Sequence, residues 1–407
     1  MAYRNKIALV YLLGYALDLV NMFAAAIAYP DISQQLQASV SQLGWVANAY
    51  MLGLTLVIIP GVWLAAVFGE KRLIMASLLL FSLASWCVAQ AGSIEALIGW
   101  RLLQGLGGGL LIPVGQAMVY RHFPVRERAR LTSVILLVAL LVPALSPVLG
   151  GRVVEAWSWR WVFYANLPLA LLALLLAGCW LKSEPRPASR PVLNAHSLAT
   201  GARNMGRLLK SPLLRVAMLT YLFIPGIFIG TQLVSILYLH QQGLSPALTG
   251  TLMLPWALAS ALGITLSRYQ FNHLGPKPLL LLGMTAQATG IALLIQADVS
   301  STWQTMALYG LMGFGGSLCS STAQNTAFID VSARRMGHAS ALWNINRQLS
   351  FLLGPALMMG IFAALTVITS TPRAFALCFA IGAALTLLPL FAVLRLNTPR
   401  VLALLAP

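Results

Sequence analysis

Three charged side chains stand well inside long apolar stretches of this sequence, namely Asp18, Arg101 and Arg347. Asp18 lies in the middle of an apolar run over residues 7–29, and Arg101 lies near the start of another over 96–119. In a hydrocarbon setting a carboxylate persists where it pairs, faces water or takes up a proton. The positions therefore predict a proton-coupling pair in which Asp18 binds the proton and Arg101 is its partner. The alternative is that Asp18 serves only as a structural counter-ion for Arg101.

Amide and aromatic side chains form a second set of candidates. Groups of this kind, placed around a cavity, bind flat and amphipathic molecules, whereas those near the ends of apolar runs belong as well to an interfacial aromatic belt. Gln104 lies three residues after Arg101, which places both on one face of a helix. The predicted cavity residues are Asn21, Asn48, Tyr50, Gln104, Tyr221, Gln232, Trp256, Asn325, Trp343 and Asn346.

Glycine and proline residues mark expected sites of close packing or bending. Small residues let neighbouring membrane helices approach, and proline frees a backbone carbonyl and permits a bend. Ordinary packing accounts for most of the glycines, and the prolines fit a static kink as well as a moving hinge. The candidates are Gly105, Gly109, Pro143, Pro147, Gly150, Gly151 and Pro355.

The composition identifies the elements that must hold these residues. Of 407 residues, 59% are apolar and only 9% are charged, which excludes a water-soluble globule. The four cysteines are scattered singly, so the sequence indicates neither a disulfide scaffold nor a metal site. We predict an all-α membrane protein with twelve spans, at 7–29, 43–67, 73–91, 96–119, 131–151, 163–181, 213–240, 246–267, 277–296, 303–323, 339–367 and 373–394.

The basic residues predict how these spans are oriented. With the amino terminus inside, 21 of the 26 lysines and arginines fall on the inner side and three on the outer side. This asymmetry is the positive-inside rule, so the net charge of +17 reflects topology and not nucleic-acid binding. The first run is long and contains Asp18, which favours a retained helix over a cleaved signal peptide. Both termini are expected in the cytoplasm.

An internal repeat divides the chain. GLGGGL begins at Gly105 and GFGGSL at Gly313, and Pro147 and Pro355 stand in similar segments with the same offset of 208. Two homologous six-helix bundles in parallel orientation explain this register, and a site between such repeats is known for secondary transporters. We expect bundles over 1–181 and 213–396, a cytoplasmic linker over 182–212 and a tail over 397–407.

These residues resemble the major facilitator superfamily, and within it the drug/proton antiporters of the EmrB/QacA type. The most specific stretches are LGWVANAYML at 43–52, RLLQGLGGGLLIP at 101–113, and SPVLGG around Pro147. The resemblance implies the superfamily fold and proton-coupled export of amphipathic or drug-like small molecules by alternating access. It also implies a monomer in the bacterial inner membrane, with the proton gradient as energy source and no cofactor. Arg101 matches the arginine that is linked to proton transfer in those relatives.

Some positions depart from the family pattern. Asn21 stands where the first helix usually carries an aspartate, and Asp18 lies about one turn away. Ala66 and Val67 stand where a cytoplasmic loop usually holds an Asp and Arg gate, and Val142 and Ser146 replace glycines. These departures suit an alternative to the drug exporter, namely a dedicated exporter of one endogenous metabolite such as a siderophore or peptide-like product.

Two other classes of function fit the sequence less well. A transporter-shaped sensor that moves nothing would need an appended soluble domain. An intramembrane enzyme would need a Ser–His, paired-Asp or metal-ligand constellation, which the sequence does not contain. We therefore expect a transporter and no enzyme.

Overall fold

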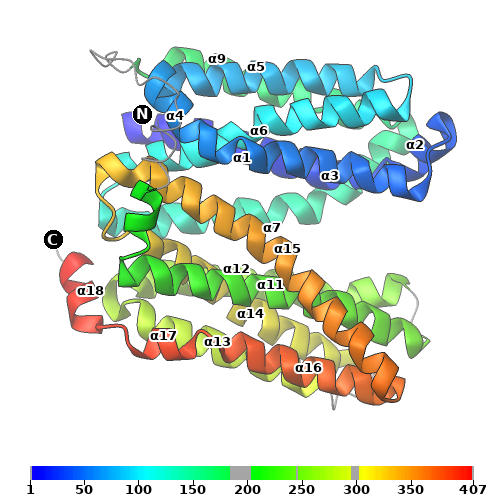
Figure 1. Ribbon diagram of the computed structural model, residues 1–407, viewed down its shortest axis with the longest axis vertical. Helices are drawn as coiled ribbons and strands as arrows, with labels where there is room; N and C mark the ends of the chain where they lie inside the picture. Colours follow the sequence, from blue (N-terminus) through cyan, green and yellow to red (C-terminus); the bar gives the residue numbers. More distant parts are fainter. Residues whose placement is uncertain (1, 184–202, 244–245, 295–301, 406–407) are drawn as a thin grey trace. The chain divides into compact units, whose positions relative to one another are not determined.

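The computed structural model describes residues 2–183, 203–243, 246–294 and 302–405 (Figure 1). Over the described residues each expected span is helical, and no strand occurs among them. A helix satisfies its own backbone hydrogen bonds, which is the requirement that hydrocarbon imposes on a spanning segment. Most of the expected linker 182–212 lies outside the described residues.

The helices group into two units by contact. The first unit comprises Met1–Phe123, Val138–Gly206 and Ser332–Ile345. Within it α6 packs along α5, α3 and α1, and α9 packs along α5 and α1. The helices of this unit are α1 (Tyr3–Ile27), α2 (Tyr29–Leu36), α3 (Val40–Leu56), α4 (Ile58–Phe68), α5 (Glu70–Ala89), α6 (Ile94–His122), α8 (Arg160–Tyr164) and α9 (Asn166–Trp180).

The second unit comprises Pro124–Leu137, Arg207–Val331 and Asn346–Pro407. Its central helix is α14, which packs along α12, α13 and α11. Its helices are α11 (Pro212–Gln241), α12 (Pro246–Leu274), α13 (Pro276–Leu293), α14 (Thr302–Ala327), α16 (Thr371–Leu387), α17 (Leu390–Leu394) and α18 (Thr398–Leu405).

Two long helices belong to both units. Helix α7 (Val125–Ala156) begins in the second unit and ends in the first, whereas α15 (Met336–Ile368), preceded by the 3-10 turn Ala333–Arg335, begins in the first and ends in the second. Each unit therefore includes a segment from the other half of the sequence. Helix α15 continues through Pro355. Helix α7 continues through Pro143 and Pro147, whose side chains lie outside the described part of the chain.

The expected span 43–67 is two helices. The part Gln42–Leu56 and helix α4 meet at a bend of 47°. Pro60 explains the position of the bend, because its ring nitrogen carries no hydrogen and cannot bond the Leu56 carbonyl four residues earlier.

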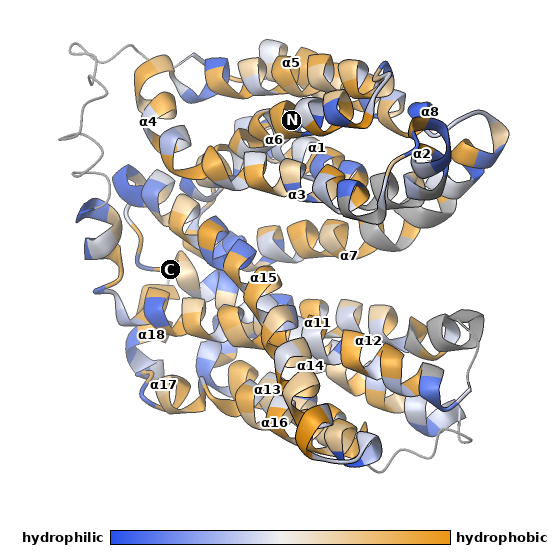
Figure 2. Ribbon diagram, turned by 45° about the vertical axis from the view of Figure 1, so that its right-hand side comes forward, coloured by the Kyte–Doolittle hydropathy of each residue, from blue (hydrophilic) through white to orange (hydrophobic). Residues whose placement is uncertain are grey.

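The surfaces of the units suit a lipid environment. In the described residues, six helices are long and apolar enough to cross a membrane, and the bent pair would add a seventh. Figure 2 shows apolar residues along the middle of helices such as α5 and α16, with hydrophilic residues near helix ends. On α12, Leu254, Leu258 and Leu262 form an exposed stripe with one residue per turn. Exposed leucines in such a row indicate that this face contacts lipid chains.

Glycine permits close contact between α3 and α6. A Cβ at Gly105 would lie 2.2 Å from the carbonyl oxygen of Tyr50, and one at Gly109 would lie 2.5 Å from that of Leu54. In the second unit a Cβ at Gly313 would lie 2.5 Å from the carbonyl oxygen of Trp256. Glycines 208 residues apart in the sequence thus allow an equivalent close helix contact in each unit, as small residues do between membrane helices.

We expect Gly105→Ala to destabilise the protein by about 1–3 kcal/mol, because the added methyl group would overlap the α3 backbone. Gly99→Ala on the same helix is the matched control, since a Cβ there meets nothing within 4 Å. Thermal unfolding of both variants in detergent measures the difference. Equal melting temperatures for the two variants would contradict the close contact.

Candidate functional site

Arg101 on α6 is 1% exposed and is held by neutral groups. Its Nε donates to the carbonyl oxygen of Val46 at 3.2 Å, and Nη1 donates to Oε1 of Gln104 at 2.7 Å. The guanidinium lies over the ring of Tyr50 at 4.3 Å and faces the ring of Phe163 at 5.7 Å. Carbonyl, amide and π faces thus replace the water that a buried guanidinium loses.

Asp18 on α1 accepts a hydrogen bond from the hydroxyl of Tyr50 on α3. Gly108 on α6 leaves room for this pair: a Cβ there would lie 3.1 Å from the Tyr50 hydroxyl and 3.4 Å from Oδ1 of Asp18. Since the ring of the same tyrosine lies under Arg101, Tyr50 connects the acid to the cation. Sequence reasoning placed Tyr50 among the cavity residues and did not predict this role.

Amides extend the network towards α5 and α9. Nε2 of Gln104 donates to Oδ1 of Asn21 at 3.1 Å and to Oγ of Ser85 at 2.6 Å. Nδ2 of Asn166 donates to the same Asn21 oxygen at 3.2 Å. Helices α1, α5, α6 and α9 are therefore joined by side-chain hydrogen bonds inside the first unit.

We call these seven residues the buried polar network, and each is at most 5% exposed. The network holds one acid, one permanent cation, one hydroxyl donor to the acid and several amides. The carboxylate is the group of this network that can carry a proton, and burial leaves its charge little screened by bulk water. Its members are Asp18, Asn21, Tyr50, Ser85, Arg101, Gln104 and Asn166.

The corresponding place in the second unit carries no charge. Tyr309 on α14 stands 208 residues after Arg101. It is fully buried and hydrogen-bonded to Ser235. An aromatic hydroxyl thus stands where the first unit has a guanidinium.

The second unit also contains a stacked pair of aromatic rings near Gly313. The backbone of Trp256 on α12 lies against Gly313 as that of Tyr50 lies against Gly105. The ring of Trp256, which is only partly buried, stacks on Phe228 with centroids 5.7 Å apart and planes at 15°. At these equivalent positions the two units offer different chemistry, a buried guanidinium in the first and a tyrosine hydroxyl near stacked aromatic rings in the second.

The other predicted cavity residues are dispersed. Asn48 is exposed, Gln232 is partly exposed, and the rest are buried. Nδ2 of Asn346 donates to the carbonyl oxygen of Met218 at 3.0 Å. The buried members are Tyr221, Asn325, Trp343 and Asn346. Among the glycine and proline candidates, Gly150 is buried and Gly151 would meet nothing with an added Cβ.

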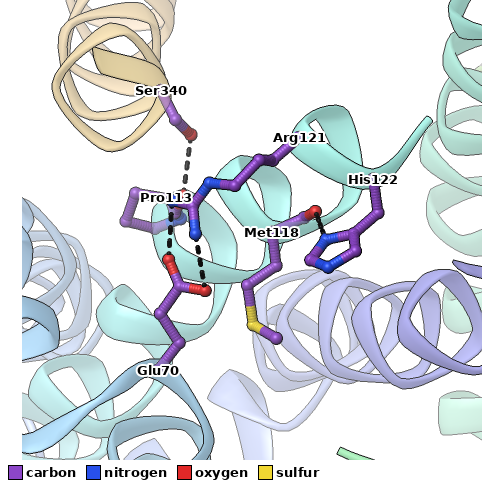
Figure 3. A network of polar contacts seen from close by, with 6 residues as sticks. All are labelled: Glu70, Pro113, Met118, Arg121, His122 and Ser340. Atoms are coloured by element: carbon purple, nitrogen blue, oxygen red, sulfur yellow. Dashed lines mark hydrogen bonds and ion pairs between the residues drawn. The ribbon is translucent and has the colours of Figure 1, made fainter. Parts of the chain in front are cut away.

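A second polar cluster lies where α5 begins and α6 ends (Figure 3). Gly69, with φ of 83°, ends α4 and precedes Glu70, the first residue of α5. Glu70 accepts two hydrogen bonds from Arg121, at 2.9 and 3.1 Å. The side chains are 8% and 26% exposed, so this two-bond pair is largely shielded from water.

The first turns of α15 join this cluster. Oγ of Ser340 donates to the carbonyl oxygen of Pro113 at 2.8 Å, as Figure 3 shows. Nδ2 of Asn344 donates to Oε1 of Gln116 at 2.7 Å. A cavity of about 210 Å³ lies beside the ion pair, and its walls are Val62, Ala65, Ala66, Glu70, Pro113, Val114, Ala117, Arg121, Arg334, Gly337 and His338.

Sequence reasoning assigned Glu70 only to a helix end. The available signal lay in the family pattern noted above, which has an acid at the position of Ala66, one helical turn before Glu70. The partner Arg121 lies on another helix, so the pair itself follows only from the tertiary structure.

Similarity to known proteins extends over most of the chain. The sequence profile of the Major Facilitator Superfamily matches residues 11–355. Multidrug resistance protein Stp of Mycobacterium tuberculosis is 26% identical over 421 residues, which cover 91% of this chain and 78% of that protein. Multidrug export protein EmrB of Haemophilus influenzae is 32% identical over 161 residues, or 40% of this chain and 32% of its own.

Solved structures show the same fold. A proton:xylose symporter superposes with a TM-score of 0.71 at 17% identity, covering 95% of this chain and 94% of that one. The human organic anion transporter TETRAN superposes with a TM-score of 0.74 at 16% identity, covering 97% and 100%. These identities are low, so the two structures support the fold alone.

We expect Glu70→Ala to lower the free energy of unfolding by about 1–3 kcal/mol, because it leaves Arg121 partly buried without its carboxylate. The double variant with Arg121→Ala should recover part of this loss, giving a coupling energy of about 1 kcal/mol or more. Denaturant unfolding in detergent measures the cycle. Glu155→Ala, which changes an exposed acid in the last turn of α7, should alter stability by less than about 0.5 kcal/mol. Strict additivity of the two single variants would contradict the pair.

Proposed function

Because the chain belongs to the major facilitator superfamily, we propose that it exports amphipathic, drug-like small molecules across the cytoplasmic membrane in exchange for protons. Membership confirms the expected family and makes the protein a transporter. Proton coupling, direction and cargo go beyond membership, and the observation that carries the proton coupling is the carboxylate of Asp18, buried in the polar network.

The energetics of Asp18 favour coupling over a purely structural role. A structural partner for Arg101 is not required of this acid, because Val46, Gln104 and the ring of Tyr50 already contact the guanidinium. Burying a second charge beside the guanidinium costs free energy, and a role in carrying the proton explains why the acid is present despite that cost. Coupling requires only that the inward-open and outward-open states of the transporter differ in the affinity of Asp18 for the proton.

The cargo is inferred from two sources. The relatives that match along most of the chain include a protein named for multidrug resistance. In this chain the partly buried ring of Trp256 stacked on Phe228 suits a flat apolar molecule, since aromatic rings stack on one another. The proton gradient supplies the energy, and no cofactor is needed.

The orientation is inferred from charge. With 21 of 26 basic residues assigned to one side, the rule places both termini and the linker in the cytoplasm. The inner membrane of a bacterium is the expected location, because relatives that match over most of this chain are bacterial.

We expect Asp18→Asn to abolish uphill export while changing stability little, because the amide removes a buried charge and keeps the shape. Arg101→Ala should impair both folding and transport, since it leaves the acid without its neighbouring cation. The measurement is accumulation of ethidium, a flat cationic dye, by everted vesicles with an acidic interior.

The matched control is Glu155→Gln, which changes an exposed acid on α7 and should transport ethidium as the wild type does. Uphill accumulation by Asp18→Asn at the wild-type rate would overturn the coupling role of Asp18. A wild-type protein that moves no ethidium would argue against a drug-like cargo.

The topology is tested with two glycines at which a Cβ meets nothing within 4 Å. In a background without Cys87, Cys179, Cys319 and Cys378, we expect Gly92→Cys to react with a membrane-impermeant maleimide in intact cells. Gly206→Cys should react only after the cells are permeabilised, because it precedes a helix that begins on the inner side. Labelling of Gly206→Cys alone in intact cells would reverse the proposed orientation.

A further inference from the structure

We propose that Tyr50 is a positioning residue through which Arg101 acts on Asp18, and that its hydroxyl sets the pH at which Asp18 exchanges its proton. This inference rests on the proposed coupling role of Asp18. It assigns a role to a third residue, on a third helix.

The position of Tyr50 is fixed from three directions. Its hydroxyl donates to Asp18 on α1, its ring face receives the guanidinium of Arg101 at 4.3 Å, and its side chain has no exposed surface. Its backbone carbonyl is held against α6, where Gly105 has no side chain to separate the helices. The absence of a Cβ at Gly108 leaves space for the hydroxyl and the carboxylate together.

The two contacts of the ring reinforce one another. A cation over an aromatic face draws electron density from the ring, and hydrogen bonds in a chain polarise each other. The Tyr50 hydroxyl thereby becomes a stronger donor, and a hydrogen bond to an ionised acceptor is stronger than one between neutral groups. The contact therefore favours the ionised form of Asp18 over the protonated form.

Charged and titratable groups reach Asp18 and Arg101 from several helices. Among the described residues, α6 brings Arg101, α3 brings Tyr50, and α2 brings Tyr29, which interacts with Arg101. Helices α8 and α9 bring the uncharged Phe163 and Asn166. Tyr50 is therefore the residue that both hydrogen-bonds the acid and contacts the cation.

This arrangement links proton exchange to helix movement. The acid, the tyrosine and the arginine lie on α1, α3 and α6. A shift of α3 against either neighbour would weaken the hydroxyl contact, the ring contact or both, and so change the proton affinity of Asp18. A direct Asp–Arg pair would not respond to α3 in this way.

The test is an infrared titration of the purified full-length protein, which needs no transported substrate. The carboxylic acid C=O band that disappears in Asp18→Asn reports the protonation of Asp18. In Tyr50→Phe, which keeps the ring and loses only the hydroxyl, we expect the midpoint of this band to move up by about 1 pH unit. The sign follows because loss of a donor to the carboxylate makes the proton harder to release.

Tyr309→Phe is the matched control, because Tyr309 is a buried tyrosine whose hydroxyl bonds Ser235 and no acid. It should leave the midpoint unchanged. Arg101→Gln should shift the midpoint less in the Tyr50→Phe background than alone, since part of its influence passes through the hydroxyl. If Arg101→Gln does not fold, the two tyrosine variants decide the matter.

The outcomes separate this inference from the proposed function. A midpoint that is equal in wild type and Tyr50→Phe, or a band that titrates in neither, would overturn the role of Tyr50. A shifted midpoint together with uphill ethidium accumulation by Asp18→Asn would retain the Tyr50–Asp18 interaction and reject proton coupling through Asp18.

Discussion

The contact of Tyr50 with both Asp18 and Arg101 is the constraint around which the first unit is organised. A charged pair inside a bundle without water must be solvated by the protein itself. Three helices must therefore meet closely enough for one aromatic side chain to reach an acid and a guanidinium. Gly105 and Gly108 make this approach possible, because any larger side chain at those positions would occupy the space of the tyrosine backbone or its hydroxyl.

The two units show how one helical scaffold serves two kinds of chemistry. Glycines at equivalent positions, Gly105 and Gly313, set the same helix contact in each. The side chains near that contact differ. The first unit buries the polar network with Asp18 and Arg101, whereas the second buries Tyr309 and stacks the partly exposed ring of Trp256 on Phe228. This difference is consistent with the proposed exchange of protons, carried at Asp18, for an amphipathic cargo that stacks on aromatic rings.

Helices α7 and α15 give each unit a segment from the other half of the chain. The first turns of α15 bond to α6 through Ser340 and Asn344, next to the ion pair of Glu70 and Arg121. The ion pair lies beside a cavity whose lining includes the small side chain of Ala66, one helical turn before Glu70.

The sequence alone predicted the helices and indicated that Asp18 and Arg101 are buried, because hydrophobic length and periodicity are local properties of the chain. It placed Gln104 on the face of Arg101, and the structure has a hydrogen bond of 2.7 Å between them. It did not reveal that Tyr50 lies between Asp18 and Arg101, nor that Glu70 pairs with Arg121. Those contacts join residues 32 and 51 positions apart, on different helices. Only the packing of glycine-lined helix faces decides which side chains meet, and no local pattern encodes that geometry.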